Sequence, residues 1–176
     1  MNIEPFQQGQ LDALCGLYAT VNAVQICQGA LSKQAALELF EELVDYLEHW
    51  DKASDERMYL GMSSLELVRA LKATQEHYPI TWKRPFIRKT PQLDHLWSKL
   101  SDFLNEPGRC VILDITDRYG QGHWTVLYRI TESVLHLCDS CGRQRINRQH
   151  CTTQSREPNT FTITAYNCFF IQLQED

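Results

Sequence analysis

The hydrophobic pattern of this chain changes its period once, near residue 108, and this change constrains the fold more than any single motif does. Before it, apolar residues recur every three or four positions, which is typical of amphipathic helices. After it, they alternate or form short apolar runs, which is typical of strands. Helices followed by strands predict an α+β fold, with an N-terminal helical part packed on a C-terminal antiparallel sheet.

Capping residues and apolar runs give the expected boundaries. The first helix is apolar nearly all round, which predicts that it is buried against the sheet. The third has a capping box, because Ser63 is followed three positions later by Glu66. The expected helix starts are Cys15, Ser32, Ser63 and Thr90. The expected strands span 110–115, 123–130, 134–138, 161–165 and 169–173.

Cys15 begins the first helix, and Gln10 precedes it by five residues. A catalytic thiol needs a helix N-terminus, a neighbouring imidazolium or both to hold it as the thiolate. The N–H groups of a first helical turn favour negative charge and can stabilise an oxyanion, for which the Gln10 amide could supply a second donor. Taken alone, Cys15 has a simpler interpretation as a buried core cysteine.

His123 and Asp139 are placed together by the geometry of a predicted hairpin. If residues 131–133 form its loop, Ile130 pairs with Val134, and Asp139 falls opposite Thr125, diagonal to His123 and on the same face. A two-residue loop would shift the parity and separate them.

An Asp beside an imidazole fixes its tautomer and stabilises its cation. Separately, His123 could be a surface histidine beside a glycine turn, and Asp139 a turn former. Together, the order Gln, Cys, His, Asp indicates a thiol hydrolase.

These motifs resemble the papain-like cysteine peptidases, in particular the bacteriocin-processing leader peptidases that cut after a double glycine. Residues 122–127 (GHWTVL) are similar to the histidine strand of that family, and residues 12–16 (DALCG) to its nucleophile segment. The resemblance implies that Cys15 is the nucleophile, His123 the general base and acid, Asp139 the orienting carboxylate and Gln10 the oxyanion donor. The five-residue spacing of Gln10 and Cys15 is instead similar to that of the Josephin-type deubiquitinases.

Three functions remain open at this stage. The first is a cysteine peptidase acting on an extended peptide or a ubiquitin-like tail. The second is a protein deamidase or transglutaminase-type effector, which uses the same residues on a side-chain amide. The third is a zinc-stabilised or inactive binding module. For the enzymes, the residues expected to line the substrate cleft are Trp124, Tyr119 and Gln121.

Composition narrows the class of protein. The 176 residues fit one catalytic domain spanning 1–176, and a net charge of −5 gives no reason to expect nucleic acid as a partner. No apolar run has the length of a membrane span, and the N-terminus does not resemble a signal peptide. We therefore expect a cytoplasmic protein, or one exported as an effector without a cleavable signal peptide, with a protein or peptide substrate and no cofactor.

Two further clusters have alternative interpretations. Seven cysteines without secretory context favour reduced thiols. One group of cysteines and histidines contains a CxxC pair and could hold zinc, although we expect no metal there; its members are His136, Cys138, Cys141, His150 and Cys151. A basic patch is expected to be a solvated loop; it comprises Lys83, Arg84, Arg88 and Lys89.

Overall fold

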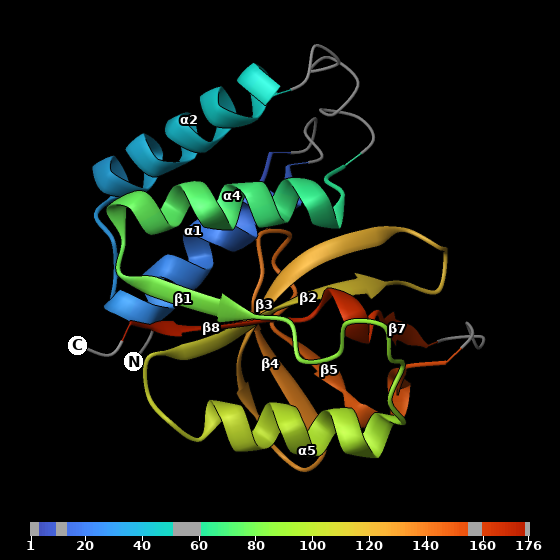
Figure 1. Cartoon of the computed structure of the whole chain (residues 1–176). Coiled ribbons are helices and arrows are strands. Elements are labelled where there is room, and N and C mark those ends of the chain that lie inside the picture. The colour runs from blue at the N-terminus through green and yellow to red at the C-terminus, as the bar shows by residue number, and fades with distance from the viewer. Residues whose placement is uncertain (1–3, 10–13, 51–60, 155–159, 175–176) are drawn as a thin grey trace.

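The computed structural model describes residues 4–9, 14–50, 61–154 and 160–174. Its helices are α1 (Cys15–Gln28), α2 (Lys33–Trp50), α4 (Ser64–His77) and α5 (Leu93–Leu104) (Figure 1). Its strands are β1 (Ile80–Lys83), β2 (Arg109–Thr116), β3 (Gly122–Ile130), β4 (Val134–Cys138), β5 (Arg145–Asn147), β6 (Cys151–Thr152), β7 (Phe161–Ile163) and β8 (Phe169–Leu173). The expected α+β class is confirmed.

The strands form one twisted sheet in the order β1, β8, β2, β3, β4, β5, and every neighbouring pair in this order is antiparallel. β7 pairs with the last two residues of β2, beyond the part of β2 that pairs with β8, and β6 pairs with β7 in parallel. α1, α2 and α4 lie on one side of this sheet and α5 on the other (Figure 1).

Alternate residues of β2 divide the core into two clusters. Cys110 and Ile112 pack with α1 and α4, whereas Val111 and Leu113 pack with α5. This alternation follows from the two-residue period of a strand, which here is covered on both faces. The continuous apolar run of β2 is the sequence signature of that double burial.

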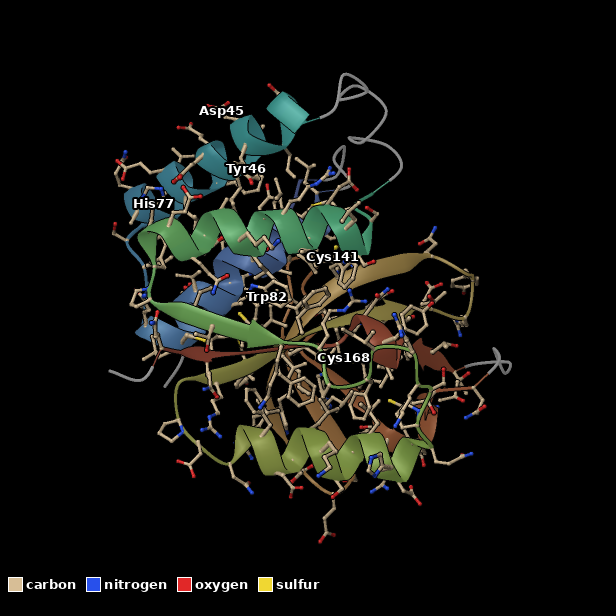
Figure 2. All side chains as sticks on the ribbon, viewed as in Figure 1. Asp45, Tyr46, His77, Trp82, Cys141 and Cys168 are labelled. Atoms are coloured by element: carbon tan, nitrogen blue, oxygen red, sulfur yellow. The ribbon has the colours of Figure 1, made fainter. Side chains whose placement is uncertain are left out.

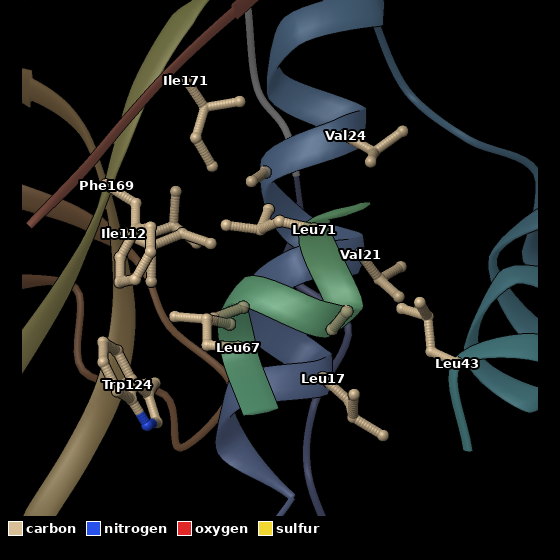
Figure 3. Close-up of a cluster of buried hydrophobic side chains, with 14 of the residues drawn as sticks. Leu17, Val21, Val24, Leu43, Leu67, Leu71, Ile112, Trp124, Phe169 and Ile171 are labelled. Atoms are coloured by element: carbon tan, nitrogen blue, oxygen red, sulfur yellow. The ribbon is translucent and has the colours of Figure 1, made fainter. Parts of the chain in front are cut away.

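α1 is apolar on all sides because it lies between the sheet and the other two helices of its layer. Val21 of α1 points toward Leu43 of α2, and Trp124 and Phe169 approach α1 from the sheet (Figure 3). On the outer surface, Nε2 of His77 in α4 lies 2.6 Å from Oε1 of Glu42 in α2 (Figure 2 labels His77). Burial of α1 on all sides fixes the position of its first residue, Cys15.

The predicted helices and strands lie close to their observed bounds, and the differences have simple causes. α4 begins with the expected capping box, in which the Ser63 side chain accepts from the Glu66 backbone N–H and the Glu66 carboxylate accepts from the Ser63 backbone N–H. α5 begins at Leu93, later than the predicted Thr90. β1, β5 and β6 were not predicted, because each is at most four residues long and shows too little alternation.

The hairpin of β3 and β4 reaches the predicted alignment by a different route. Ile130 pairs with Leu135, not with Val134 as expected, and the Thr131 backbone N–H donates to the Val134 carbonyl, so the loop is residues 132–133 and is one residue shorter than the sequence indicated. A bulge between Leu127 and Arg129 then inserts one extra residue into β3, and beyond it Val126 pairs with Cys138. The short turn alone would have moved Asp139 to the opposite face of the sheet from His123. The extra residue in β3 shifts the pairing by one position and returns both side chains to the same face.

The expectation that the basic patch is a solvated loop is wrong for Arg84. Its guanidinium donates to the Tyr166 carbonyl at 2.6 and 2.9 Å and lies 5.0 Å from the centroid of the Phe169 ring. Lys83, Arg88 and Lys89 are exposed. No helix in the described ranges combines the length and the apolar composition needed to cross a membrane.

Candidate active site

Cys15 is the first residue of α1 and is only 7% exposed. The Leu14 carbonyl accepts the N–H groups of Leu17 and Tyr18, which closes the first turn of the helix. The backbone N–H of Trp124 in β3 points at the sulfur, with an N to Sγ distance of 3.5 Å. The sulfur therefore lies between a helix N-terminus and a donor from the sheet, both of which stabilise negative charge.

His123 and Asp139 form a direct hydrogen bond, with 2.7 Å between Nε2 and Oδ2. The Asp139 side chain is fully buried, whereas 19% of the His123 side chain is exposed. Because Nε2 is engaged with Asp139, Nδ1 is the ring nitrogen left for the interaction of His123 with the Cys15 thiol.

The electrostatics of these three residues favour a charged imidazole. Burial lowers the pKa of His123, but interactions with Asp139 and then with Cys15 outweigh it and raise that pKa to about 10. Burial raises the pKa of Asp139, yet the hydrogen bond and charge of His123 bring the pKa below its ordinary value. The two shifts agree, since each partner stabilises the charged form of the other.

The other carboxylate oxygen of Asp139 holds the turn that follows β4. Oδ1 accepts the backbone N–H of Cys141 at 2.9 Å and that of Arg143 at 3.0 Å. The adjacent Thr125 also helps to lower the pKa of Asp139, although its buried hydroxyl makes no hydrogen bond of good geometry. Asp139 is thus fixed by its own turn before it orients His123.

A pocket of about 270 Å³ opens beside the thiol and the imidazole. Its walls come from the start of α1, the segment before α4, the ends of β2 and β3, and the residues before β8. The lining residues are Cys15, Gly61, Met62, Ser63, Ser64, Asp114, Gly122, His123, Trp124 and Asn167.

The three residues predicted to line the cleft lie in three different pockets. Trp124 lines the thiol pocket and is largely a packing residue, because its indole donates to the Met62 carbonyl at 2.8 Å and contacts Phe169. Gln121 lines a second pocket of about 200 Å³ on the Cys141 side of His123. Tyr119 is 70% exposed and lines a third pocket of about 380 Å³ that adjoins the second. Only Trp124 therefore borders the thiol directly.

Gln10 lies outside the described residues, so its predicted role as oxyanion donor stays a prediction. The nearby Gln8 is described. Its side-chain oxygen lies 3.4 Å from the Ser140 hydroxyl and 3.7 Å from the Cys141 sulfur, and its backbone N–H donates to the Ser140 carbonyl. The segment before the nucleophile is thus attached to the turn that holds Asp139.

Sequence reasoning missed Asp114, which lines the thiol pocket from β2. The signal was available, because Asp114 is the one charged residue in the otherwise apolar stretch Cys110–Ile115. Asn167, which donates to the Asp114 carboxylate at 2.9 Å, lies in a short 3₁₀ turn before β8 and had no comparable signal.

The zinc cluster considered from the sequence is not assembled. Cys138 packs in the core cluster of α1 and Cys151 in that of α5, on the opposite face of the sheet. Burial raises the pKa of each of these thiols to about 12. In the described part of the chain, potential ligand atoms come together at His123, Asp139 and Cys141, within 4.8 Å of one another.

No family model matches this chain, and no curated protein matches it either. Among solved structures, the avirulence protein AvrPphB of Pseudomonas aligns over 91% of this chain and 89% of its own, with a TM-score of 0.37 and 12% sequence identity. A similarity that low carries no argument about the site. The more specific likeness to double-glycine leader peptidases gains no support from these comparisons.

Proposed function

We propose that this protein is a papain-like thiol hydrolase, with Cys15 as nucleophile, His123 as general base and acid, and Asp139 as the residue that orients the imidazole. The observation that carries the proposal is the chain of contacts from a buried carboxylate through His123 to a cysteine at a helix N-terminus. Structural cysteines need neither an oriented imidazole nor an adjoining pocket.

The proposed reaction follows from these positions. The Cys15 sulfur attacks the carbonyl carbon of the substrate, and His123 holds the thiol proton. His123 then passes this proton to the leaving amine as the C–N bond breaks, which leaves a thioester on Cys15. Water, deprotonated by His123, attacks the thioester and releases the acid and the free thiol.

The negative oxygen that forms in both steps needs donors in place before the reaction. The N–H groups at the start of α1 are close to the sulfur, and we propose the Gln10 side chain as the second donor. The substrate we favour is an extended peptide or a ubiquitin-like tail, since two pockets adjoin at Gly122 and His123, which line both of them.

The alternatives differ from the peptidase in what the cleft admits. A deamidase or transglutaminase-type effector would run the same chemistry on a glutamine side chain. A binding module would leave Cys15 unreactive. The oriented imidazole favours an enzyme over the module.

A peptide carrying an electrophilic vinyl sulfone tests the proposal. We expect the probe to label wild-type protein at Cys15, to label His123→Ala much more slowly, and not to label Cys15→Ala. Cys141→Ser is the matched control, because Cys141 is the exposed thiol of the described residues and its loss should leave the label on Cys15. Equal labelling of wild type and Cys15→Ala would contradict the assignment of the nucleophile.

A further inference from the structure

Asp114 lies on the side of β2 that faces α1. Cys110 and Ile112, four and two residues before it, pack against α1, so the two-residue period of the strand directs Asp114 to the same side. Its partner across the β2–β3 ladder is Trp124, next to His123. Asp114 therefore borders the thiol pocket, together with Cys15 and His123.

The negative charge of Asp114 has no cationic partner in the described residues. Its side-chain contacts are neutral: Asn167 donates to Oδ2 at 2.9 Å, and Thr164 contributes a further hydrogen bond. Burial raises the pKa of this carboxyl, and the two neutral donors offset part of that effect. The other ionisable group of the pocket wall besides the thiol, His123, is already paired with Asp139. A cation that entered the pocket would therefore meet an uncompensated carboxylate.

The position of Asp114 is fixed by residues that have no part in the triad. Arg84 donates to Oδ1 of Asn167 at 2.9 Å, which turns the amide nitrogen of Asn167 toward Asp114. Arg84 is held in turn by the Tyr166 carbonyl. Arg84 and Asn167 thus orient a carboxylate at the wall of the pocket beside Cys15. A hydrophobic residue at position 114 would continue the apolar pattern of β2 and would need neither contact.

We propose that Asp114 is the specificity-determining residue of this site and selects substrates with a lysine or arginine side chain next to the bond that is cleaved. The inference rests on the proposed thiol hydrolase and names its substrate class. A cationic side chain in the pocket supplies the charge partner that Asp114 lacks, and a neutral side chain of the same length leaves the carboxylate unpaired and partly desolvated.

Internally quenched fluorogenic peptides test this. At each position flanking the cleaved bond they carry lysine, arginine, acetyl-lysine or norleucine. At one of these positions we expect wild type to prefer lysine or arginine over norleucine by about tenfold or more in kcat/KM, the effect of one charge-assisted hydrogen bond. Acetylation, which keeps the side chain and removes the charge, should abolish that preference.

In Asp114→Asn the ratio of the lysine to the norleucine peptide should fall toward one, while Asn still accepts from Asn167. Asp94→Asn is the control, because its side chain is 90% exposed on α5, and it should keep the wild-type ratio. If Asp114→Asn does not fold, the comparison of lysine and acetyl-lysine peptides in wild type still shows whether the pocket selects a positive charge.

Two failures are distinguishable. A wild type that cleaves peptides at Cys15 with no preference for a cation overturns the role of Asp114 alone. A wild type that neither cleaves any peptide nor reacts with the vinyl sulfone overturns the proposed function itself.

Discussion

The Nε2 atom of His123 lies 2.7 Å from Oδ2 of Asp139, and the other oxygen of that carboxylate is already committed to the turn after β4. Oδ1 accepts two backbone N–H groups, those of Cys141 and Arg143, so the carboxylate cannot rotate without breaking the turn. The imidazole is therefore oriented by a group that the fold has fixed independently. The two oxygens therefore have different partners, and a substitution at Asp139 changes the hydrogen bond to His123 and the hydrogen bonds of the turn separately.

We expect Asp139→Asn to reduce kcat/KM by about 10³-fold or more, although Asn is nearly isosteric. The turn needs an acceptor at the Oδ1 position, so the amide oxygen stays there and the NH₂ group faces His123. Nε2 must then accept a hydrogen bond, which moves the ring proton to Nδ1, and Nδ1 can no longer take the proton of Cys15.

Nitrogen NMR of the His123 ring measures this directly. The protonated nitrogen should change from Nε2 to Nδ1 in neutral Asp139→Asn, in parallel with the kinetic loss. Activity close to wild type together with an unchanged tautomer would mean that the amide has rotated and that the turn does not fix the carboxylate.

The ion pair also predicts how stability depends on pH. The pKa of His123 is raised from its ordinary 6.5 to about 10, so its contribution is complete below 6.5 and is lost as the pH rises toward 10. The pKa of Asp139 is lowered from 3.8, so its contribution is present above that value and is lost as the pH falls below it. The Tm difference between wild type and Asp139→Asn should be largest between about pH 4 and 6.5 and should shrink on both sides.

Thermal unfolding of the two proteins at pH 3, 5.5, 8 and 10 checks this window. The same series on Asp94→Asn serves as the control, since the exposed Asp94 pairs with Arg148 at the surface and its loss should change Tm little at any pH. A Tm difference between wild type and Asp139→Asn that stays constant from pH 5.5 to 10 would contradict the charged pair.

Local patterns in the sequence predicted α1 and the hairpin strands, because apolar period and capping depend on nearby residues, and strand alternation predicted that His123 and Asp139 lie side by side. They did not predict the route by which Asp139 comes beside His123. The sequence indicated a three-residue loop, and the structure has a tighter turn plus a bulge near Tyr128 that together give the same alignment. Strand pairing is set by tertiary packing as well as by the turn. The predicted pairing was therefore wrong next to the turn, at Ile130, and right beyond the bulge, where Asp139 lies beside His123.

Tertiary contacts also explain what the sequence did not reveal. Among the strands of the described residues, β1 pairs with β8 alone and forms the edge of the sheet, and its four residues carry no pattern of their own. Arg84 lies next to exposed basic residues in the sequence, and only the fold brings it to Tyr166 and Asn167, more than eighty residues away. The role of Asp114 depends on that same long-range contact.

Gly16 should be intolerant of alanine, although alanine favours a helix. A Cβ at position 16 would lie 2.8 Å from Sδ and 3.2 Å from Cβ of Met62. Met62 cannot retreat freely, because it is 8% exposed and its carbonyl accepts the Trp124 indole. Overpacking costs about 1–3 kcal/mol, whereas the helix gain reaches about 1 kcal/mol only in a helix interior and Gly16 is in the first turn, so we expect Gly16→Ala to lower the free energy of unfolding.

Urea unfolding of Gly16→Ala, Met62→Ala and the double variant isolates this contact. The double variant should be more stable than the sum of the single losses predicts, by about 0.5 kcal/mol or more, because the shorter side chain at position 62 makes room for the new methyl group. Additive losses, or a Gly16→Ala protein more stable than wild type, would show that Met62 adjusts without cost.

Zinc should inhibit this protein through Cys141, the exposed thiol in the turn after β4 (Figure 2). The ligand atoms of His123, Asp139 and Cys141 lie within 4.8 Å of one another, so a small movement of the exposed Cys141 side chain would bring all three to about 2.0–2.3 Å from one ion. Zinc bound there competes for the His123 nitrogen that Asp139 orients, so we expect reversible inhibition at micromolar zinc and recovery of activity with a chelator. In Cys141→Ser the inhibition constant should rise about tenfold or more, because a thiolate is the strongest of the three ligands.

Magnesium is the matched control, since it prefers oxygen ligands and should not inhibit. Cobalt gives a second readout that does not depend on turnover, as a bound thiolate produces a sulfur-to-metal charge-transfer band. This band should be present with wild type and with Cys15→Ala but absent with Cys141→Ser. If it disappears in Cys15→Ala instead, the metal binds on the nucleophile side of His123, and Cys141 has no part in inhibition.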